Sequence, residues 1–468
     1  MKEEQSYNGY WWLPESPDDK IPGIITIKND NWSKLELFGA FSIDKDKLFK
    51  RIKHSIILGI FSQTEYLTLV NSDGLVNIIY DNNYDLKFYK SNFECIYTIK
   101  NSHFNDFDKI KFDKFTLYFD CLNDWVNIEH PISHEFNKNQ MSFINNKTEP
   151  IIIDINESLK MSFEFVDIVI GPLIHEHMEG YKKETSIQFT SLIPLTLNDC
   201  EILLRRIQDF LSFAIQKPVY HSELYAISII DQSILPRFNK FSTVKLFIRA
   251  RGENFEYKKK FPSNMMFTFN CINEVKEIFF QNWINNIDKF DLAYHLYFAV
   301  QFNSSNYLES KFLSYIQAIE GFHRRLFNDF YIQDENDFKN NVFEIMKSAI
   351  PQSLDIDLQN KLIDTLKHSN EFSLRKRLKG ILSGISTNFK KNLIINYDNE
   401  KEFIDKVVYI RNYFSHILDD TINFEDPKYD LYEISRRLKV ILEYCLLKAL
   451  KLDQEKIEEL LNTSLSFD

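Results

Sequence analysis

The strongest constraint on the fold is a change in the spacing of apolar residues near residue 270. Before this point, short β-rich runs are separated by Asn, Asp, Gly and Pro, the residues that form turns. After it, apolar residues recur with the 3.6-residue period of amphipathic helices. The pattern predicts an α+β protein: a β-rich, sandwich-like or barrel-like domain over 1–272, a connecting helix over 273–300 and an all-α bundle over 301–468.

The individual elements can be placed from the same pattern. Strands are predicted at Gly23–Ile27, Leu35–Phe41, Leu67–Asn71, Phe115–Leu122, Pro150–Ile155, Met161–Ile170, Ser186–Leu192 and Thr243–Ala250. One helix, Leu197–Ile215, is predicted among them, with Asn198 as its N-cap. Helices are then predicted within 273–287, 308–327, 359–369, 372–382, 401–416 and 429–450.

Charge and cysteine content exclude several classes of protein. The net charge of −11 argues against a surface coated with positive field for non-specific nucleic-acid binding, although a local basic cleft stays open. The five cysteines are scattered, with no C-x-x-C pair, which predicts reduced, buried thiols and neither a zinc knuckle nor a disulfide framework. No apolar run approaches about 20 residues, so a cytoplasmic protein without a membrane span is expected.

The residues best suited to catalysis lie in "VVYIRNYFSH", Val407–His416. Cleaving RNA without a metal needs one group that exchanges protons near neutral pH, which suits His416. It also needs a fixed cation beside the phosphate, which suits Arg411. The amide of Asn412 can orient either group. Taken alone the pattern also fits a solvated helix end.

Helical geometry limits how these groups can meet. At 3.6 residues per turn, Arg411 and Ser415 share a face, whereas His416 lies about 140° around the helix from Arg411. One straight helix therefore does not aim both groups at one phosphate. Either the helix ends at the motif, or two copies face each other across a dimer.

Several stretches together resemble a known family. "RNYFSH" (Arg411–His416), "LESKFLSYIQAIEGFHRR" (Leu308–Arg325) and "FSLRKRLKGIL" (Phe372–Leu382) resemble the Apea-like HEPN domain. The opening segment Gly9–Phe41 is similar to the N-terminal domain of ApeA proteins. These resemblances occur in both halves of the chain and in the family's order.

The resemblance implies a bacterial anti-phage protein, with a toxic, metal-independent RNase in the helical domain. The β-rich domain would restrain the RNase or sense an unknown phage trigger. Arg411 and His416 take the family's catalytic positions, with Asn412 as the polar residue after the arginine and Glu320 as an acidic residue on an early helix. A homo-oligomer formed through the HEPN domain, no cofactor, and RNA as substrate are implied, with tRNA suggested by family analogy.

Clusters of basic residues offer a further expectation. An RNA cleft beside His416 would use the arginines of the helical domain, namely Arg324, Arg325, Arg375, Arg377, Arg436 and Arg437. The alternative is that these clusters are solvated faces, as charge runs usually are.

Two further interpretations compete with the nuclease. The chain could instead be a binding protein, with a β-rich recognition domain on a helical dimerisation module and a structural R-x4-H. His175 and His177 could share a strand face, but no third metal ligand is evident, so no metal site is predicted.

Trp11 and Trp12 are expected to close the β core and not to form a recognition patch.

Overall fold

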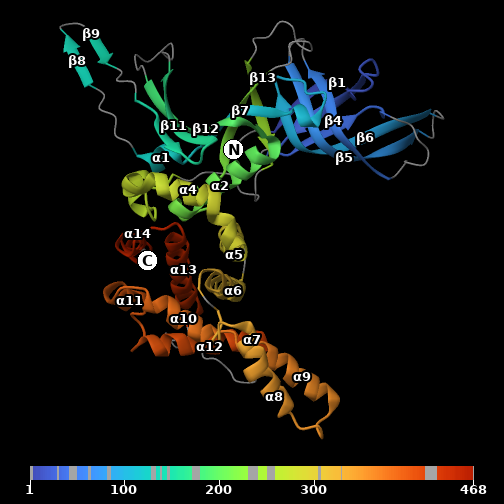
Figure 1. The fold of residues 1–468 in the computed structure, drawn as a ribbon. Helices are drawn as coiled ribbons and strands as arrows, with labels where there is room; N and C mark the ends of the chain where they lie inside the picture. The colour runs from blue at the N-terminus through green and yellow to red at the C-terminus, as the bar shows by residue number, and fades with distance from the viewer. Residues whose placement is uncertain are drawn as a thin grey trace. The chain divides into compact units, whose positions relative to one another are not determined.

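The computed structural model describes residues 4–28, 31–41, 50–61, 65–81, 86–127, 133–137, 140–144, 148–170, 180–229, 241–249, 259–303, 307–327, 329–416 and 430–466. The chain forms two compact units, Met1–Ile284 and Asn285–Asp468. The first is built mainly of strands and the second of helices (Figure 1). The predicted fold class, a β-rich domain followed by a helical bundle, is therefore confirmed.

The first six strands close into a barrel. They are β1 (Gln5–Trp12), β2 (Ile21–Ile27), β3 (Ser33–Leu37), β4 (Arg51–Phe61), β5 (Glu65–Asp81) and β6 (Leu86–Lys100). The ring runs β1-β2-β3-β6-β5-β4 and returns to β1, with every pair antiparallel. Closure leaves no free strand edge within the ring.

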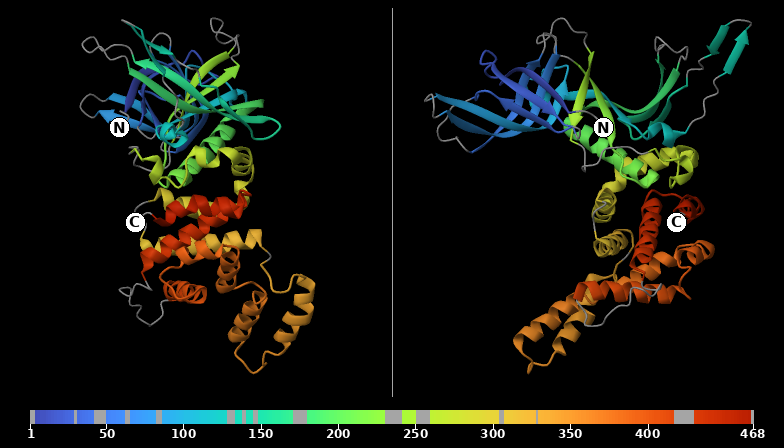
Figure 2. Two further views of the ribbon diagram at one scale, coloured as in Figure 1. Left: turned by 90° about the vertical axis from the view of Figure 1, so that its left-hand side faces the viewer. Right: turned by 180° about the vertical axis from the view of Figure 1, so that it is seen from behind.

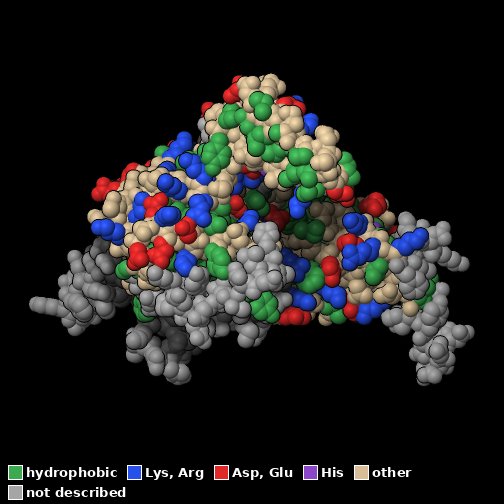
Figure 3. Space-filling model, turned by 90° about the horizontal axis from the view of Figure 1, so that it is seen from below, with side chains coloured by type: hydrophobic (Ala, Val, Ile, Leu, Met, Phe, Trp, Pro, Cys, Tyr) green, Lys and Arg blue, Asp and Glu red, His purple; other side chains and the backbone are tan. Residues whose placement is uncertain are grey.

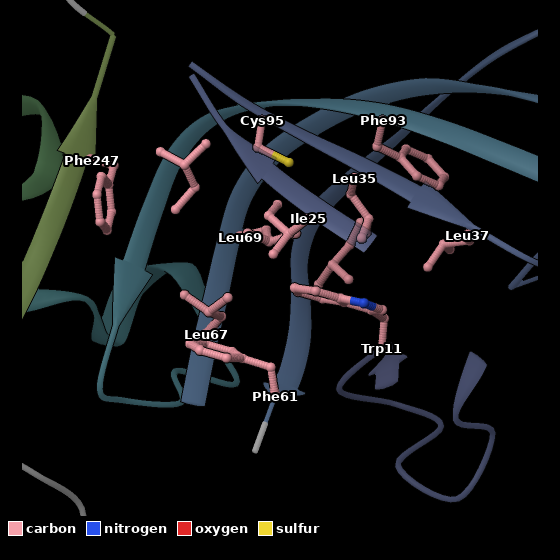
Figure 4. Close-up of a cluster of buried hydrophobic side chains, with 12 residues drawn as sticks. Trp11, Ile25, Leu35, Leu37, Phe61, Leu67, Leu69, Phe93, Cys95 and Phe247 are labelled. Carbon is pink, nitrogen blue, oxygen red and sulfur yellow. The ribbon is translucent and has the colours of Figure 1, made fainter. Parts of the chain in front are cut away.

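Side chains fill the barrel, so it is a packed core. Trp11 lies at its centre and is fully buried (Figure 4). Its ring lies directly over Gly59, where a Cβ atom would lie 2.2 Å from a ring carbon. Trp12 is also buried, which confirms that these tryptophans belong to the β core.

A second set of strands continues the sheet from β6. They are β7 (Lys111–Phe119), β10 (Ile151–Asp154), β11 (Leu159–Ile170), β12 (Gly180–Thr196), β13 (His221–Ile229) and β14 (Phe241–Ile248), in the order β10-β11-β12-β7-β13-β14-β6. A separate hairpin pairs β8 (Ser133–Asn137) with β9 (Gln140–Ile144).

Helix α2 (Leu197–Ile215) has the predicted bounds but a different cap. The Oγ1 atom of Thr196 accepts a hydrogen bond from the Asp199 backbone, and the Asp199 carboxylate accepts one from the Thr196 backbone. This reciprocal capping box satisfies two backbone donors, so the expected Asn198 cap is wrong.

Helix α2 packs on α1 (Leu122–Val126) and α4 (Lys276–Asn286) through buried aromatic rings, and α3 (Phe269–Ile272) joins this cluster through Phe269, whose ring contacts Trp125. Phe210 lies at the centre, with ring contacts to Trp125, Phe280 and Trp283. Trp283 also donates a hydrogen bond from Nε1 to the Arg206 carbonyl over 2.8 Å.

The cysteines are all free thiols, as expected, and all but Cys271 are buried. Burial raises the pKa of the Cys95 and Cys445 thiols to about 12, which keeps them protonated at neutral pH. They are therefore structural residues.

The second unit contains the remaining helices. They are α5 (Asp291–Phe302), α6 (Leu308–Leu326), α7 (Glu335–Phe338), α8 (Glu344–Ser348), α9 (Ile356–Lys367), α10 (Leu374–Ser383), α11 (Thr387–Leu393), α12 (Glu400–His416), α13 (Leu431–Ala449) and α14 (Gln454–Ser466). Helix α6 packs against α5, α10, α12 and α13. Helices α7–α9 project from this bundle as a separate arm (Figure 2).

Candidate functional site

Helix α12, which carries the motif Arg411–His416, packs one buried face against the rest of the helical unit. Its residues Phe403, Val407 and Ile410 are fully buried and recur at the i, i+4, i+7 spacing of one helix face. Phe414 extends this contact, since its ring centroid lies 6.0 Å from that of Phe312 on α6. The motif therefore lies at the end of α12, beside the beginning of α6.

Arg411 and Asn412 are in direct contact. Arg411 donates from Nη1 to the Asn412 Oδ1 over 3.2 Å, and both side chains are partly exposed. Neighbouring side chains on a helix diverge by about 100°, so this contact requires the arginine to curl toward the asparagine. Asn412 thereby holds the guanidinium without neutralising it.

The partner of Arg411 differs in charge from the partners of most other arginines in the helical unit. Carboxylate or backbone carbonyl oxygens engage the guanidinium groups of Arg324, Arg325, Arg375, Arg377, Arg436 and Arg437. Among the described residues, the side-chain partner of Arg411 is the neutral amide of Asn412. A guanidinium group with no carboxylate partner among the described residues is suited to bind a phosphate.

The position of His416 is fixed by the backbone. Helix α12 continues through His416, its last residue, with Ser415 exposed just before it. The side chain of His416 lies outside the described part of the chain. Because the helix is unbroken from Arg411 to His416, the two residues are about 140° apart around its axis.

Glu320 is joined to Arg377 instead of to the motif. Arg377 is 2% exposed and makes a bidentate ion pair with Asp329, from Nε over 2.9 Å and from Nη2 over 2.6 Å. Its Nη1 donates to Glu320 over 3.2 Å. This network connects α6, α10 and the segment after α6.

Two of the expected RNA-facing arginines are buried. Arg377 is enclosed by Asp329 and Glu320, and Arg437, 3% exposed, donates to the Leu393 carbonyl and to Glu433. Burial leaves neither guanidinium open to a phosphate, so we remove both from the RNA-facing candidates.

The remaining basic residues are more accessible but paired. Arg324 donates to Glu371 over 2.6 Å, and Arg375 forms an ion pair with Asp405 of α12. Arg436 donates to Glu433 over 3.0 Å. Burial favours the neutral form of Glu433, but its arginine partners outweigh this and hold the pKa of Glu433 below its usual range.

The carboxylates that engage these arginines were not predicted. Asp329 lies 48 positions from Arg377, Glu371 lies 47 positions from Arg324, and Asp405 lies 30 positions from Arg375. Sequence spacing reveals pairs within one helix, three or four residues apart, but not such long-range pairs.

No group of three or more His, Cys, Asp or Glu in the described residues is arranged to hold a metal ion. His175 and His177, the pair considered from the sequence, lie outside these residues. No helix among the described residues is long and apolar enough to cross a membrane.

The helical unit and its terminal R-x4-H motif define a HEPN-type domain, and residues 313–456 match the family model for the Apea-like HEPN domain. Residues 6–283, more than half of the chain, match the model for ApeA N-terminal domain 1. The chain therefore belongs to the family of ApeA-like proteins. No curated protein and no solved structure matches it.

The family carries a general functional expectation. HEPN domains are generally nucleases, typically dimerise and act on RNA. ApeA-like membership in turn suggests an anti-phage HEPN nuclease.

Proposed function

We propose that this protein is a metal-independent endoribonuclease of bacterial anti-phage defence, with Arg411 and His416 as its catalytic residues. The observation that carries the proposal is the state of Arg411. It is held by a neutral amide, while the other arginines of its unit are engaged by carboxylates or carbonyls. Family membership supplies the reaction class.

The proposed reaction is a transesterification. The 2′-hydroxyl of one nucleotide loses its proton to a base and attacks the adjacent phosphorus, while the bond to the 5′-oxygen breaks and that oxygen gains a proton. His416 moves these protons, since an imidazole titrates near neutral pH. Arg411 stabilises the negative charge that grows on the phosphorane. The products are a 2′,3′-cyclic phosphate and a 5′-hydroxyl end.

The site is composite in this proposal. The backbone positions of Arg411 and His416 lie about 140° apart around one helix, so one copy does not present both to the same phosphate. A two-fold dimer places Arg411 of one copy opposite His416 of the other. Each dimer then holds two equivalent sites. Asn412 positions Arg411, and Ser415 lies on the face that Arg411 occupies.

The β-rich unit has a regulatory role in this proposal. It restrains the nuclease until it senses a phage component, and the active nuclease then cleaves a structured RNA such as tRNA in the cytoplasm. Growth arrest of the infected cell is the expected result.

The test is cleavage of total tRNA by purified protein in EDTA, with mapping of the RNA ends. Cleavage to cyclic-phosphate ends that Arg411→Ala and His416→Ala abolish supports the proposal. Lys401→Ala, an exposed cation at the other end of α12, is the matched control and should cut normally. Loss of cleavage in EDTA alone contradicts the metal-independent mechanism. Full cleavage by both site variants favours the alternative, a binding protein whose motif is structural.

A further inference from the structure

The arm formed by residues 334–368 leaves large apolar side chains in solvent. Neither α7, α8 nor α9 contains a buried residue. The exposed aliphatic side chains of the arm are Ile345, Met346, Ile356, Leu358 and Leu362. Figure 3 shows hydrophobic side chains gathered on the lobe at the top of that view. An apolar surface that its own fold does not cover marks an interaction site.

The root of the arm, in contrast, is held firmly. Asn370 is buried, accepts a side-chain hydrogen bond from the Ile332 backbone and donates one back to the Ile332 carbonyl, both over 2.8 Å. Phe372 donates its backbone N–H to the Asp329 carbonyl over 2.8 Å. Arg377 clamps the Asp329 carboxylate below them. A rigid root under a helical hairpin without a core of its own presents that hairpin to a partner.

The charge of the arm limits which partner fits. The arm carries seven carboxylates and four lysines, so it is net acidic. An acidic surface disfavours RNA and anionic membranes, which attract clustered cations. Its exposed aliphatic side chains favour a protein partner.

The charges along α9 are arranged for self-pairing. Asp355 and Asp357 give its beginning two negative charges, whereas Lys361, Asp364 and Lys367 give the rest of the helix one net positive charge. Leu358 and Leu362, one turn apart, share a face between these ends. Two copies of α9 placed antiparallel across a two-fold axis set the acidic beginning of each against the basic end of the other.

We propose that the arm is a self-association surface, in which α9 of one copy packs antiparallel on α9 of a second copy. Helix α9 has 12 residues and is therefore about 18 Å long, so the contact is smaller than a standard interface of roughly 800 Å² per partner. The contact is thus reversible and concentration-dependent. It does not depend on the proposed nuclease activity.

The first test removes the apolar contact. Sedimentation velocity of the full chain over a concentration series should show self-association that Leu358→Gln/Leu362→Gln weakens at least about tenfold. Glutamine keeps the helix propensity of leucine, and circular dichroism checks that the variant is folded. Leu292→Gln/Ile395→Gln is the matched control, since both side chains are exposed in the same unit but off the arm. Association that Leu358→Gln/Leu362→Gln leaves unchanged comes from another contact, such as the dimer proposed at Arg411 and His416, and overturns the proposal. A chain that stays monomeric throughout, or a control that weakens association equally, also overturns it.

The second test reads the antiparallel arrangement. Asp357→Lys alone, or Lys367→Asp alone, places like charges opposite each other and should weaken association. The double variant restores opposite charges only when two copies pair antiparallel, so its association should recover toward wild type. Lys367 also forms an exposed ion pair with Asp364, which contributes little to stability. A double variant as weak as both singles combined contradicts the pairing.

Discussion

The Arg411 guanidinium donates a hydrogen bond to the Asn412 side-chain oxygen over 3.2 Å, at the end of α12. Asn412 orients the guanidinium through an amide oxygen, which carries no formal charge and so does not neutralise it. A positioning role of this kind predicts different kinetic effects for two substitutions of Asn412, one to alanine and one to aspartate.

Asn412→Ala should reduce the kcat of RNA cleavage about 10- to 100-fold with little change in KM, because Arg411 keeps its charge but loses its orientation. Asn412→Asp should lower kcat and also raise KM, because a carboxylate neutralises the guanidinium beside the phosphate. Steady-state kinetics on an RNA oligonucleotide distinguish the two. Equal kinetics for both variants and wild type would remove Asn412 from the site.

The buried pair of Arg377 and Asp329 should be essential for the stability of the helical unit. Asp329→Asn leaves the Arg377 charge buried with fewer acceptors, and Arg377→Met leaves the carboxylate buried. Each should lower the free energy of unfolding by about 3–5 kcal/mol in urea titrations. The double variant should lose less than the sum of the singles. Arg325→Ala, whose side chain is exposed, is the control and should be near neutral.

His323 should make stability depend on pH. Burial lowers the pKa of His323 below its ordinary value of 6.5, against the opposing effect of Asp329, and Arg377 lowers it further. Because the unfolded chain binds the proton more tightly, this contribution is present above pH 6.5 and is lost as the pH falls toward the folded pKa. The melting temperature should therefore fall on mild acidification, and less steeply for His323→Gln. Identical pH profiles for the two proteins contradict this role.

Gly59 should tolerate no side chain. A Cβ atom there would lie 2.2 Å from the Trp11 ring inside the closed barrel, so Gly59→Ala forces the core apart. Overpacking of this kind costs about 1–3 kcal/mol or more, measurable by chemical denaturation. Gly384→Ala is the matched control, since its Cβ would meet the flexible end of Lys448 at 3.3 Å. Equal stability losses would mean that Gly59 has no special packing role.

Local signals account for what the sequence predicted well. The change in apolar period placed the β-rich and helical parts, and the spacing within Leu197–Ile215 gave that helix its observed bounds. Closure of the barrel could not be predicted, because it depends on the pairing of β4 with β1 and of β5 with β6. Register between strands is set by tertiary packing.

The candidate site also has features that the sequence could predict and features that it could not. Arg411, Asn412 and His416 are close in sequence, so the motif could be recognised and its angular spacing calculated. Arg377, in contrast, is buried against Asp329 and Glu320, which come from other elements of the fold. Arg411 contacts Asn412 and lacks a carboxylate partner among the described residues. No local pattern carries that information.

The most direct test of the composite site is a heterodimer of Arg411→Ala and His416→Ala chains. Co-expression with two different affinity tags and purification through both yields dimers with one chain of each kind. A composite site predicts that the heterodimer recovers about half of wild-type RNA cleavage, since one of its two sites has both residues intact. Each homodimer should be inactive. A heterodimer as inactive as the homodimers would contradict the account.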